Sequence, residues 1–192
     1  MAETQLIFIT GGVRSGKSAY AEQQLRQLAD MNHAKRLVYV ATGVGFDDEM
    51  KKRIARHQFD RQKQQLNWVT FEQPTNLRKL LPLIQPGDVM LWDCVTTWLT
   101  NEFYEGFETG ICNWQRPEKL EQRIHDMKNT ILQLHSLQIP IVIVSNEVLD
   151  EPISSNQEVQ LYQRHLGNLH QWFIKQATQA IEIEYGHVHQ WK

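Results

Sequence analysis

LIFITGGVRSGKS, residues 6–18, is the stretch that decides the fold of this chain. An apolar run, Leu6–Thr10, leads directly into the pattern G-x-x-x-x-G-K-[ST]. Glycines let the backbone turn with its N–H groups pointing around phosphate oxygens, the lysine brings a positive charge to the β- and γ-phosphates, and the last hydroxyl is offered to Mg²⁺. The motif therefore predicts that the chain binds ATP or GTP with magnesium. The predicted phosphate-binding residues are Gly11, Gly12, Val13, Arg14, Ser15, Gly16, Lys17 and Ser18.

Along the rest of the chain, short apolar runs alternate with longer amphipathic stretches. Several runs are continuous and rich in Val and Ile, which is typical of parallel strands buried on both faces. Together with the phosphate loop, this alternation predicts an α/β fold: a three-layer P-loop NTPase (RecA-like) fold in a single domain over residues 1–192. The predicted strands are Leu6–Thr10, Arg36–Ala41, Asn67–Phe71, Val89–Trp92, Ile139–Ser145 and Ala180–Glu184, and the predicted helices are Ser18–Asp30, Asp47–Gln65, Pro117–Leu137 and Gln157–Gln176.

Two segments fall outside this alternation. Residues 181–191, with Tyr185-Gly186 at the centre, predict an antiparallel hairpin that closes one edge of the mostly parallel sheet. Residues 101–116 contain two glycines and fit no period, so we expect a loop there.

Composition and charge argue against several classes of protein. The net charge of −2 lacks the basic excess of a dedicated nucleic-acid binder. The two cysteines, Cys94 and Cys112, have no metal-binding spacing. The N-terminus reads neither as a signal peptide nor as a membrane span, so we expect a cytoplasmic protein.

A second part of a magnesium site is expected at the end of an apolar strand. Val89–Trp92 is such a strand, and Asp93 follows it directly, which predicts that Asp93 and Ser18 organise the metal. Glu147 and Asp150, after the run IPIVIVSN, compete with Asp93 for this position.

Further motifs carry a family resemblance. GGVRSGKS, ATG with DDEMKKRIARHQFDR, WVTFE, WDCVTTWLTN and VSNEV occur in the order and spacing found in the bifunctional adenosylcobinamide kinase and adenosylcobinamide-phosphate guanylyltransferase family of cobalamin synthesis. The likeness covers residues 5 to 148. It implies that the chain phosphorylates adenosylcobinamide with ATP or GTP. It also implies transfer of GMP from GTP to the product through a guanylylated histidine, and assembly as a trimer, for which residues 101–116 are a candidate interface.

The resemblance also assigns site residues. His57 matches the family's nucleophile, and Arg61 keeps the His-x-x-x-Arg spacing. A neutral imidazole is a competent nucleophile toward an α-phosphorus, and on a helix a residue four positions later shares its face. The catalytic residues predicted are thus His57, Lys17 and Arg61. Further nucleotide contacts are implied for Ala41, Thr42, Gly43, Gln58, Phe59, Asp60, Arg61, Glu72 and Asp93.

The chain departs from the family pattern after Val148, where a glycine-rich stretch is replaced by LDEPISSNQEVQ, and at Gln62, where the family has proline. Two other functions therefore stay open at this stage. One is a small-molecule P-loop kinase without the guanylyl step, and the other is a nucleotide-binding regulatory protein.

Overall fold

The computed structural model describes residues 4–43, 67–150 and 154–192. In those residues the strands are β1 (Leu6–Gly11), β2 (Arg36–Ala41), β3 (Trp68–Glu72), β4 (Asp88–Asp93), β5 (Ile141–Val144), β6 (Gln179–Glu184) and β7 (His187–Gln190). The α-helices are α1 (Lys17–Met31), α3 (Val95–Tyr104), α4 (Pro117–Ser136) and α5 (Gln157–Gln176), with 3₁₀ turns η1 (Leu77–Leu83), η2 (Phe107–Thr109) and η3 (Asn113–Gln115).

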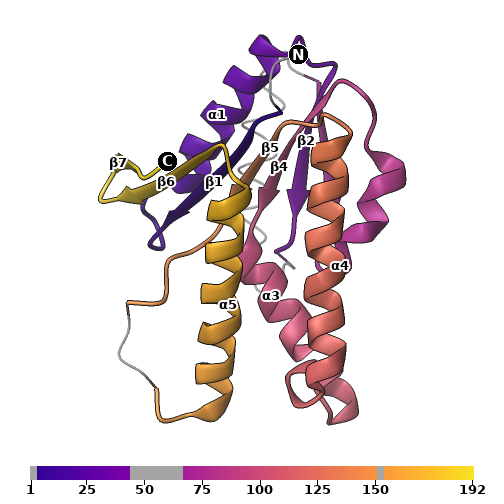
Figure 1. The fold of residues 1–192 in the computed structure, drawn as a ribbon, viewed down its shortest axis with the longest axis vertical. Helices are drawn as coiled ribbons and strands as arrows, with labels where there is room; N and C mark the ends of the chain where they lie inside the picture. Colours follow the sequence, from indigo (N-terminus) through magenta and orange to yellow (C-terminus); the bar gives the residue numbers. More distant parts are fainter. Residues whose placement is uncertain (1–3, 44–66, 151–153) are drawn as a thin grey trace.

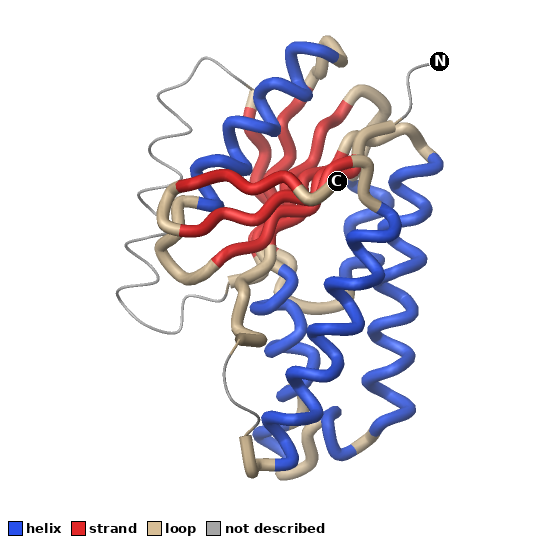
Figure 2. The backbone as a smooth tube through the Cα atoms, turned by 60° about the vertical axis from the view of Figure 1, so that its left-hand side comes forward, coloured by secondary structure: helices blue, strands red, loops and turns tan. Residues whose placement is uncertain are grey.

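Over the described ranges, the strands form one sheet in the order β3-β2-β4-β5-β1-β6-β7. Every pairing is parallel except β6 with β7, which is the predicted C-terminal hairpin. Helix α1 covers one face of the sheet, and α3, α4 and α5 lie on the other side, as Figures 1 and 2 show. The predicted three-layer, mostly parallel α/β fold is confirmed.

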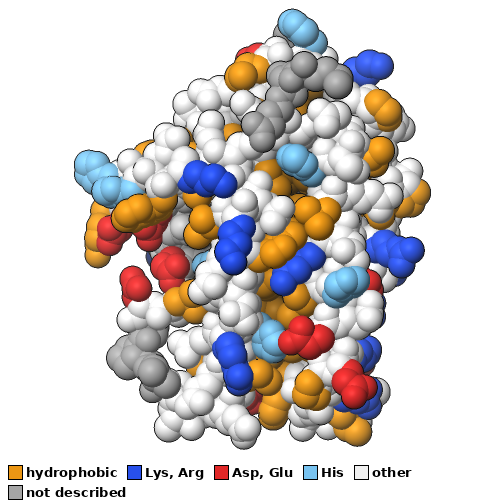
Figure 3. All heavy atoms as spheres, viewed as in Figure 1, with side chains coloured by type: hydrophobic (Ala, Val, Ile, Leu, Met, Phe, Trp, Pro, Cys, Tyr) orange, Lys and Arg blue, Asp and Glu red, His pale blue; other side chains and the backbone are white. Residues whose placement is uncertain are grey.

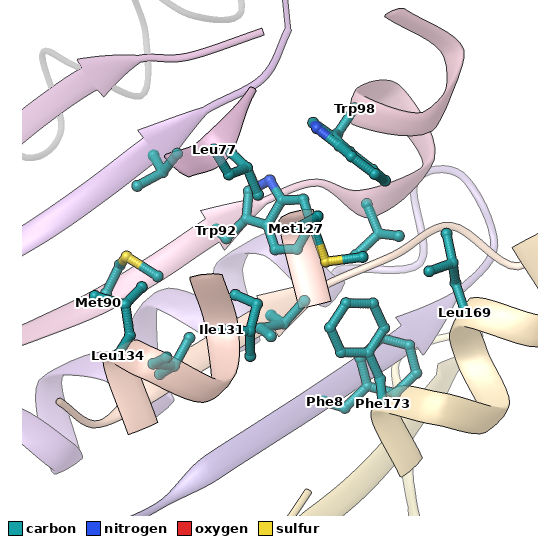
Figure 4. Packing of buried hydrophobic residues seen from close by; sticks show 14 of the residues in the cluster. Phe8, Leu77, Met90, Trp92, Trp98, Met127, Ile131, Leu134, Leu169 and Phe173 are labelled. Atoms are coloured by element: carbon teal, nitrogen blue, oxygen red, sulfur yellow. The ribbon is translucent and has the colours of Figure 1, made fainter. Parts of the chain in front are cut away.

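The larger core lies between the sheet and helices α3, α4 and α5 (Figure 4). Phe8 of β1 stacks on Phe173 of α5 with ring centroids 5.1 Å apart, and Trp92 of β4 meets Phe173 edge-on at 6.0 Å. Each such aromatic, when fully buried, contributes on the order of 2–3 kcal/mol through the hydrophobic effect. This packing fixes β1 and β4, the two strands that lead into the predicted site.

The smaller core lies on the other face, between α1 and the sheet. Ile7 and Ile9 of β1 point to this face, while Leu6 and Phe8 point to the larger core. Because successive side chains of a strand alternate between faces, a strand covered on both sides must be apolar throughout. This is why β1 and β5 read as unbroken apolar runs.

The loop predicted over residues 101–116 is wrong in part. Asn101–Tyr104 forms the end of α3, and two 3₁₀ turns, η2 and η3, occupy much of the remainder. The buried residues of α3 include Val95, Trp98, Leu99 and Phe103, which follow helical spacing. The apolar stripe of α3 starts in VTT, residues 95–97, whose β-branched side chains do not favour a helix, and it continues past Asn101. The predicted loop started at Asn101 and therefore cut through this helix.

The outer face of α4 and α5 carries a mixed surface. In Figure 3, Lys, Arg and His side chains lie among acidic and apolar ones on this side of the molecule. Among the helices of the described ranges, we find none with the length and apolar character needed to cross a membrane. The predicted helix Asp47–Gln65 falls outside the described residues.

Candidate nucleotide-binding site

The phosphate loop connects the end of β1 to the start of α1. Gly11 has φ +151° and Gly16 has φ +94°, and between them Arg14 is in the left-handed region at φ 62°. A Cβ atom on Gly11 would lie 2.3 Å from the carbonyl oxygen of Ile183 and 2.8 Å from Ser15 Oγ. Glycine is thus required at this position because β6 passes directly against the backbone. The N–H of Ser15 donates to the carbonyl of Gly12 at 3.2 Å, which closes the turn.

Lys17 is the first residue of α1 and is only 5% exposed. Its Nζ donates to the carbonyl oxygen of Gly12 at 2.9 Å, so the side chain folds back over the loop. The helix that starts here directs the positive end of its dipole and its first N–H groups at the same place. The arrangement of a lysine, backbone N–H groups and a helix N-terminus is suited to binding a phosphate chain.

Asp93 ends β4 at the same edge of the sheet. Tyr39 of β2 donates its hydroxyl to Asp93 Oδ2 at 2.9 Å and so fixes one side of the carboxylate. Strand β5 lies between β4 and β1. At the usual strand spacing, Asp93 and the phosphate loop are therefore about 10 Å apart along the sheet edge.

Thr42 follows β2 and is fully buried. Its hydroxyl accepts from the N–H of Cys94 at 2.7 Å and donates to the carbonyl of Cys94 at 2.9 Å. The carbonyl of Thr42 accepts from Asn101 Nδ2 at 2.9 Å. Thr42 therefore connects the ends of β2 and β4 to α3 through hydrogen bonds. The sequence did not indicate this structural role.

The segment after β5 contributes groups that the sequence reasoning missed. Ser145 Oγ lies 2.8 Å from Nε2 of His170 on α5, and both residues are buried. On the other side of the ring, Nδ1 of His170 lies 3.9 Å from Glu147 Oε2. Burial lowers the pKa of His170 to about 4, so the ring is neutral near pH 7. A usable signal existed, because His170 is the polar member of an otherwise apolar helical stripe formed by Leu166, Leu169 and Phe173.

The remaining predicted residues are placed as follows. Ala41 ends β2 and is buried, Gly43 is half-buried just beyond it, and Glu72 is exposed at the end of β3, where it pairs with Ala41 in the sheet. The structure thus brings Ala41, Gly43 and Glu72 together at one sheet edge. His57, Gln58, Phe59, Asp60 and Arg61, with Gln62, lie outside the described residues.

The residues that would hold magnesium fit that ion by their chemistry. Ser18 offers a hydroxyl oxygen and Asp93 a half-buried carboxylate, and hard oxygen donors are what Mg²⁺ prefers. Of the alternatives, Glu147 faces His170, and Asp150 is exposed. In the part of the chain that the structure describes, no group of three or more His, Cys, Asp or Glu could hold a metal by itself. A magnesium ion bound mainly by substrate phosphates needs no such group.

The phosphate loop after β1, the parallel sheet and the acidic residue at the end of β4 define a P-loop nucleotide-binding protein. Two solved structures share the fold. The KaiC-like protein PH0186 of Pyrococcus horikoshii OT3 has a TM-score of 0.50 at 11% identity, with 99% of this chain and 76% of that one covered. The flagellar accessory protein FlaH of Methanocaldococcus jannaschii has a TM-score of 0.52 at 14% identity, with coverage of 98% and 76%.

Sequence comparison gives the family. The model of the cobinamide kinase / cobinamide phosphate guanyltransferase family matches residues 7–190, and the chain belongs to that family. The bifunctional adenosylcobalamin biosynthesis protein CobU of Escherichia coli K12 is 34% identical over 146 residues, which cover 74% of this chain and 75% of that protein. CobP of Pseudomonas aeruginosa, with the same description, is 33% identical over 165 residues, covering 85% and 83%.

Proposed function

We propose that this chain carries out two successive transfers on a corrinoid. In the first, it phosphorylates the aminopropanol hydroxyl of adenosylcobinamide with ATP or GTP. In the second, it attaches GMP from GTP to that phosphate through a guanylylated histidine, which gives adenosylcobinamide-GDP. Membership of the family carries this proposal, because the family is described by these two activities and its model spans nearly the whole chain.

The phosphoryl transfer is assigned to the described phosphate loop. The triphosphate would lie along the loop, with Lys17 and the backbone N–H groups of residues 12–17 on its β- and γ-phosphates. These groups are held before the substrate arrives, so they stabilise the charge that develops on the transferred phosphoryl group without reorganising. Mg²⁺, held by Ser18 and Asp93, would neutralise part of the phosphate charge.

The guanylyl transfer is assigned to His57 and Arg61 from the sequence alone. The imidazole attacks the α-phosphorus of GTP, a P–N bond forms, and pyrophosphate leaves. A phosphate oxygen of adenosylcobinamide phosphate then attacks the same phosphorus and frees the imidazole. Arg61 would hold the phosphate under attack. The other proposed nucleotide contacts are Ala41, Thr42, Gly43, Gln58, Phe59, Asp60 and Glu72. Of these, Thr42 has its hydroxyl engaged with Cys94, its N–H with the carbonyl of Asp93 and its carbonyl with Asn101, so its part is to hold Ala41 and Gly43 in place.

Product analysis tests the proposal. Adenosylcobinamide is incubated with the protein, Mg²⁺ and ATP or GTP, and the corrinoids are separated and identified by mass. We expect adenosylcobinamide phosphate with either nucleotide and adenosylcobinamide-GDP only with GTP. Lys17→Ala should lower formation of the phosphate by at least about 10²-fold, since it removes a charge aimed at the transition state, whereas Lys175→Ala, on the exposed last turn of α5, should have no effect.

The possible results distinguish the three functions that the sequence leaves open. Phosphate without the GDP product would leave a kinase that lacks the guanylyl step. An unchanged corrinoid with both nucleotides would contradict the proposal and favour a regulatory nucleotide-binding protein.

A further inference from the structure

A chain of three polar side chains crosses the interior beside the phosphate loop. Ser145 and His170 are 0% and 7% exposed, and they are 2.8 Å apart through Oγ and Nε2. Glu147 stands at the outer end of this chain, with 22% of its side chain exposed and Oε2 3.9 Å from His170 Nδ1. Buried polar groups cost free energy unless they are partnered.

The polarity of the chain follows from its two ends. A carboxylate facing Nδ1 favours the tautomer in which Nδ1 carries the hydrogen, since the alternative would direct a lone pair at a negative charge. Nε2 is then an acceptor, and the hydroxyl of Ser145 donates to it. Serine, histidine and glutamate thus form a line of dipoles that points an N–H group at the carboxylate of Glu147.

The backbone holds this carboxylate at the phosphate loop. The N–H of Glu147 donates to the carbonyl of Gly11, the first residue of the loop, at 2.8 Å. The preceding residue, Asn146, donates through Nδ2 to Thr96 Oγ1 at 2.9 Å, at the start of the helix that follows Asp93. Because β5 lies between β4 and β1, residues 145–147 occupy the sheet edge between the loop and Asp93.

The side chain of Glu147 is also oriented locally. Its Oε1 accepts from the N–H of Leu149 at 2.6 Å, and Oε2 faces His170. Leu149 in turn packs against Gly167 of α5, where a Cβ would meet its methyl group at 3.8 Å. The carboxylate is therefore held from two sides while part of it remains open to a substrate.

We propose that Glu147 is the general base of the phosphoryl transfer, and that His170 and Ser145 are positioning residues that act through it. This inference rests on the proposed kinase activity. The oxygen of the acceptor hydroxyl forms a bond to the γ-phosphorus as the bond from that phosphorus to the β-bridging oxygen breaks. The nucleoside diphosphate leaves with its electron pair, and the hydroxyl proton passes to Glu147 and then to solvent.

The residue types invite a different interpretation, in which Ser145 is a nucleophile activated by histidine and glutamate. The burial of Ser145 excludes it, because its 0% exposed side chain has no path to a substrate. Glu147 is the partly exposed member, so the reacting group lies at that end of the chain and the orienting groups lie at the other.

The test measures steady-state phosphorylation of adenosylcobinamide in Glu147→Gln, His170→Phe and the double variant, with ATP binding and thermal unfolding recorded for each. Phenylalanine keeps the ring that packs edge-on against Phe8 at a centroid distance of 5.4 Å and removes both nitrogens. His165→Phe and Glu121→Gln are matched controls, since that pair joins the same helix α5 to α4 with 4.0 Å between His165 Nδ1 and Glu121 Oε1.

We expect Glu147→Gln to lower kcat by about 10²–10⁴-fold, the usual contribution of a general base, with ATP binding retained. His170→Phe should lower kcat about tenfold in the wild-type background and have no further effect in Glu147→Gln, because its action requires the carboxylate. A merely structural role for His170 would lower kcat by the same factor in both backgrounds. The control pair should leave kcat unchanged.

Four results would overturn the inference or part of it. If the kcat of Glu147→Gln stays within threefold of wild type, Glu147 is not the general base. If high Mg²⁺ restores the kcat of that variant, Glu147 is a metal ligand instead. Equal factors for His170→Phe in both backgrounds would remove the positioning role. If the wild type itself phosphorylates no corrinoid, the proposed function fails and the assignment of Glu147 fails with it. In the other cases the wild type is active, so the two kinds of failure can be told apart.

Discussion

Gly11→Ala is the substitution whose effect the structure specifies most closely. The added Cβ would lie 2.3 Å from the carbonyl oxygen of Ile183, a backbone atom that cannot rotate away, and 2.8 Å from Ser15 Oγ. Forcing such a contact costs about 1–3 kcal/mol, and the positive φ of +151° adds about 1 kcal/mol. We expect the free energy of unfolding to fall by about 2–4 kcal/mol. Nucleotide affinity should fall at least about tenfold, because the loop must move away from β6.

Urea unfolding and a nucleotide titration measure the two effects. Gly12→Ala is the matched control, since a Cβ there meets nothing within 4 Å, and its cost should stay within about 0.5 kcal/mol. Gly16→Ala is intermediate, because its φ of +94° is strained but the space around it is open, and about 1–2 kcal/mol is expected. Equal stability of Gly11→Ala and Gly12→Ala would show that packing against β6 does not require glycine at position 11.

Three further predictions concern stability and use the same urea assay. Thr42→Val leaves the buried N–H of Cys94 without its acceptor, while the carbonyl of Cys94 keeps the N–H of Trp98 at 3.0 Å. This change should cost about 1–3 kcal/mol, whereas Thr70→Val on the exposed side of β3 should cost little. Phe173→Ala should cost about 3–5 kcal/mol, and a loss below about 1 kcal/mol would show that the aromatic core in Figure 4 is not tightly packed. Burial lowers the pKa of His170 from 6.5 to about 4, so between those pH values the unfolded chain binds a proton that the native chain does not. Stability should therefore fall by up to about 3 kcal/mol as the pH drops through this window, and His170→Phe should abolish that part of the pH dependence.

The sequence predicted the fold because its strongest signals are local. The phosphate-loop pattern follows an apolar run and precedes a helix, and strands buried on both faces read as continuous apolar segments. The hairpin of β6 and β7 was also recognisable, since Tyr185-Gly186 separates two short runs by a two-residue turn. What local signals did not reveal was α3, because its first residues are β-branched and its apolar stripe runs into residues 101–116, a segment that fits no period.

The site was less accessible to sequence reasoning. The phosphate loop and Asp93 follow from motif and position, but the partners that orient them come from distant parts of the chain. Tyr39 is 54 positions from Asp93, and Ser145 is 25 positions from His170. Such contacts depend on strand order, which the sequence did not predict. The order β4-β5-β1 is what places Glu147 between the loop and Asp93.

A single measurement tests whether the guanylyl step passes through a covalent GMP–histidine intermediate. The protein is incubated with GTP labelled in the α-phosphate and with Mg²⁺, worked up under alkaline conditions because the P–N bond is acid-labile, and analysed by intact mass beside His57→Ala. We expect a GMP adduct on the wild-type chain and none on His57→Ala. Tight GTP binding without an adduct on the wild-type chain, or an adduct that persists in His57→Ala, would contradict this expectation.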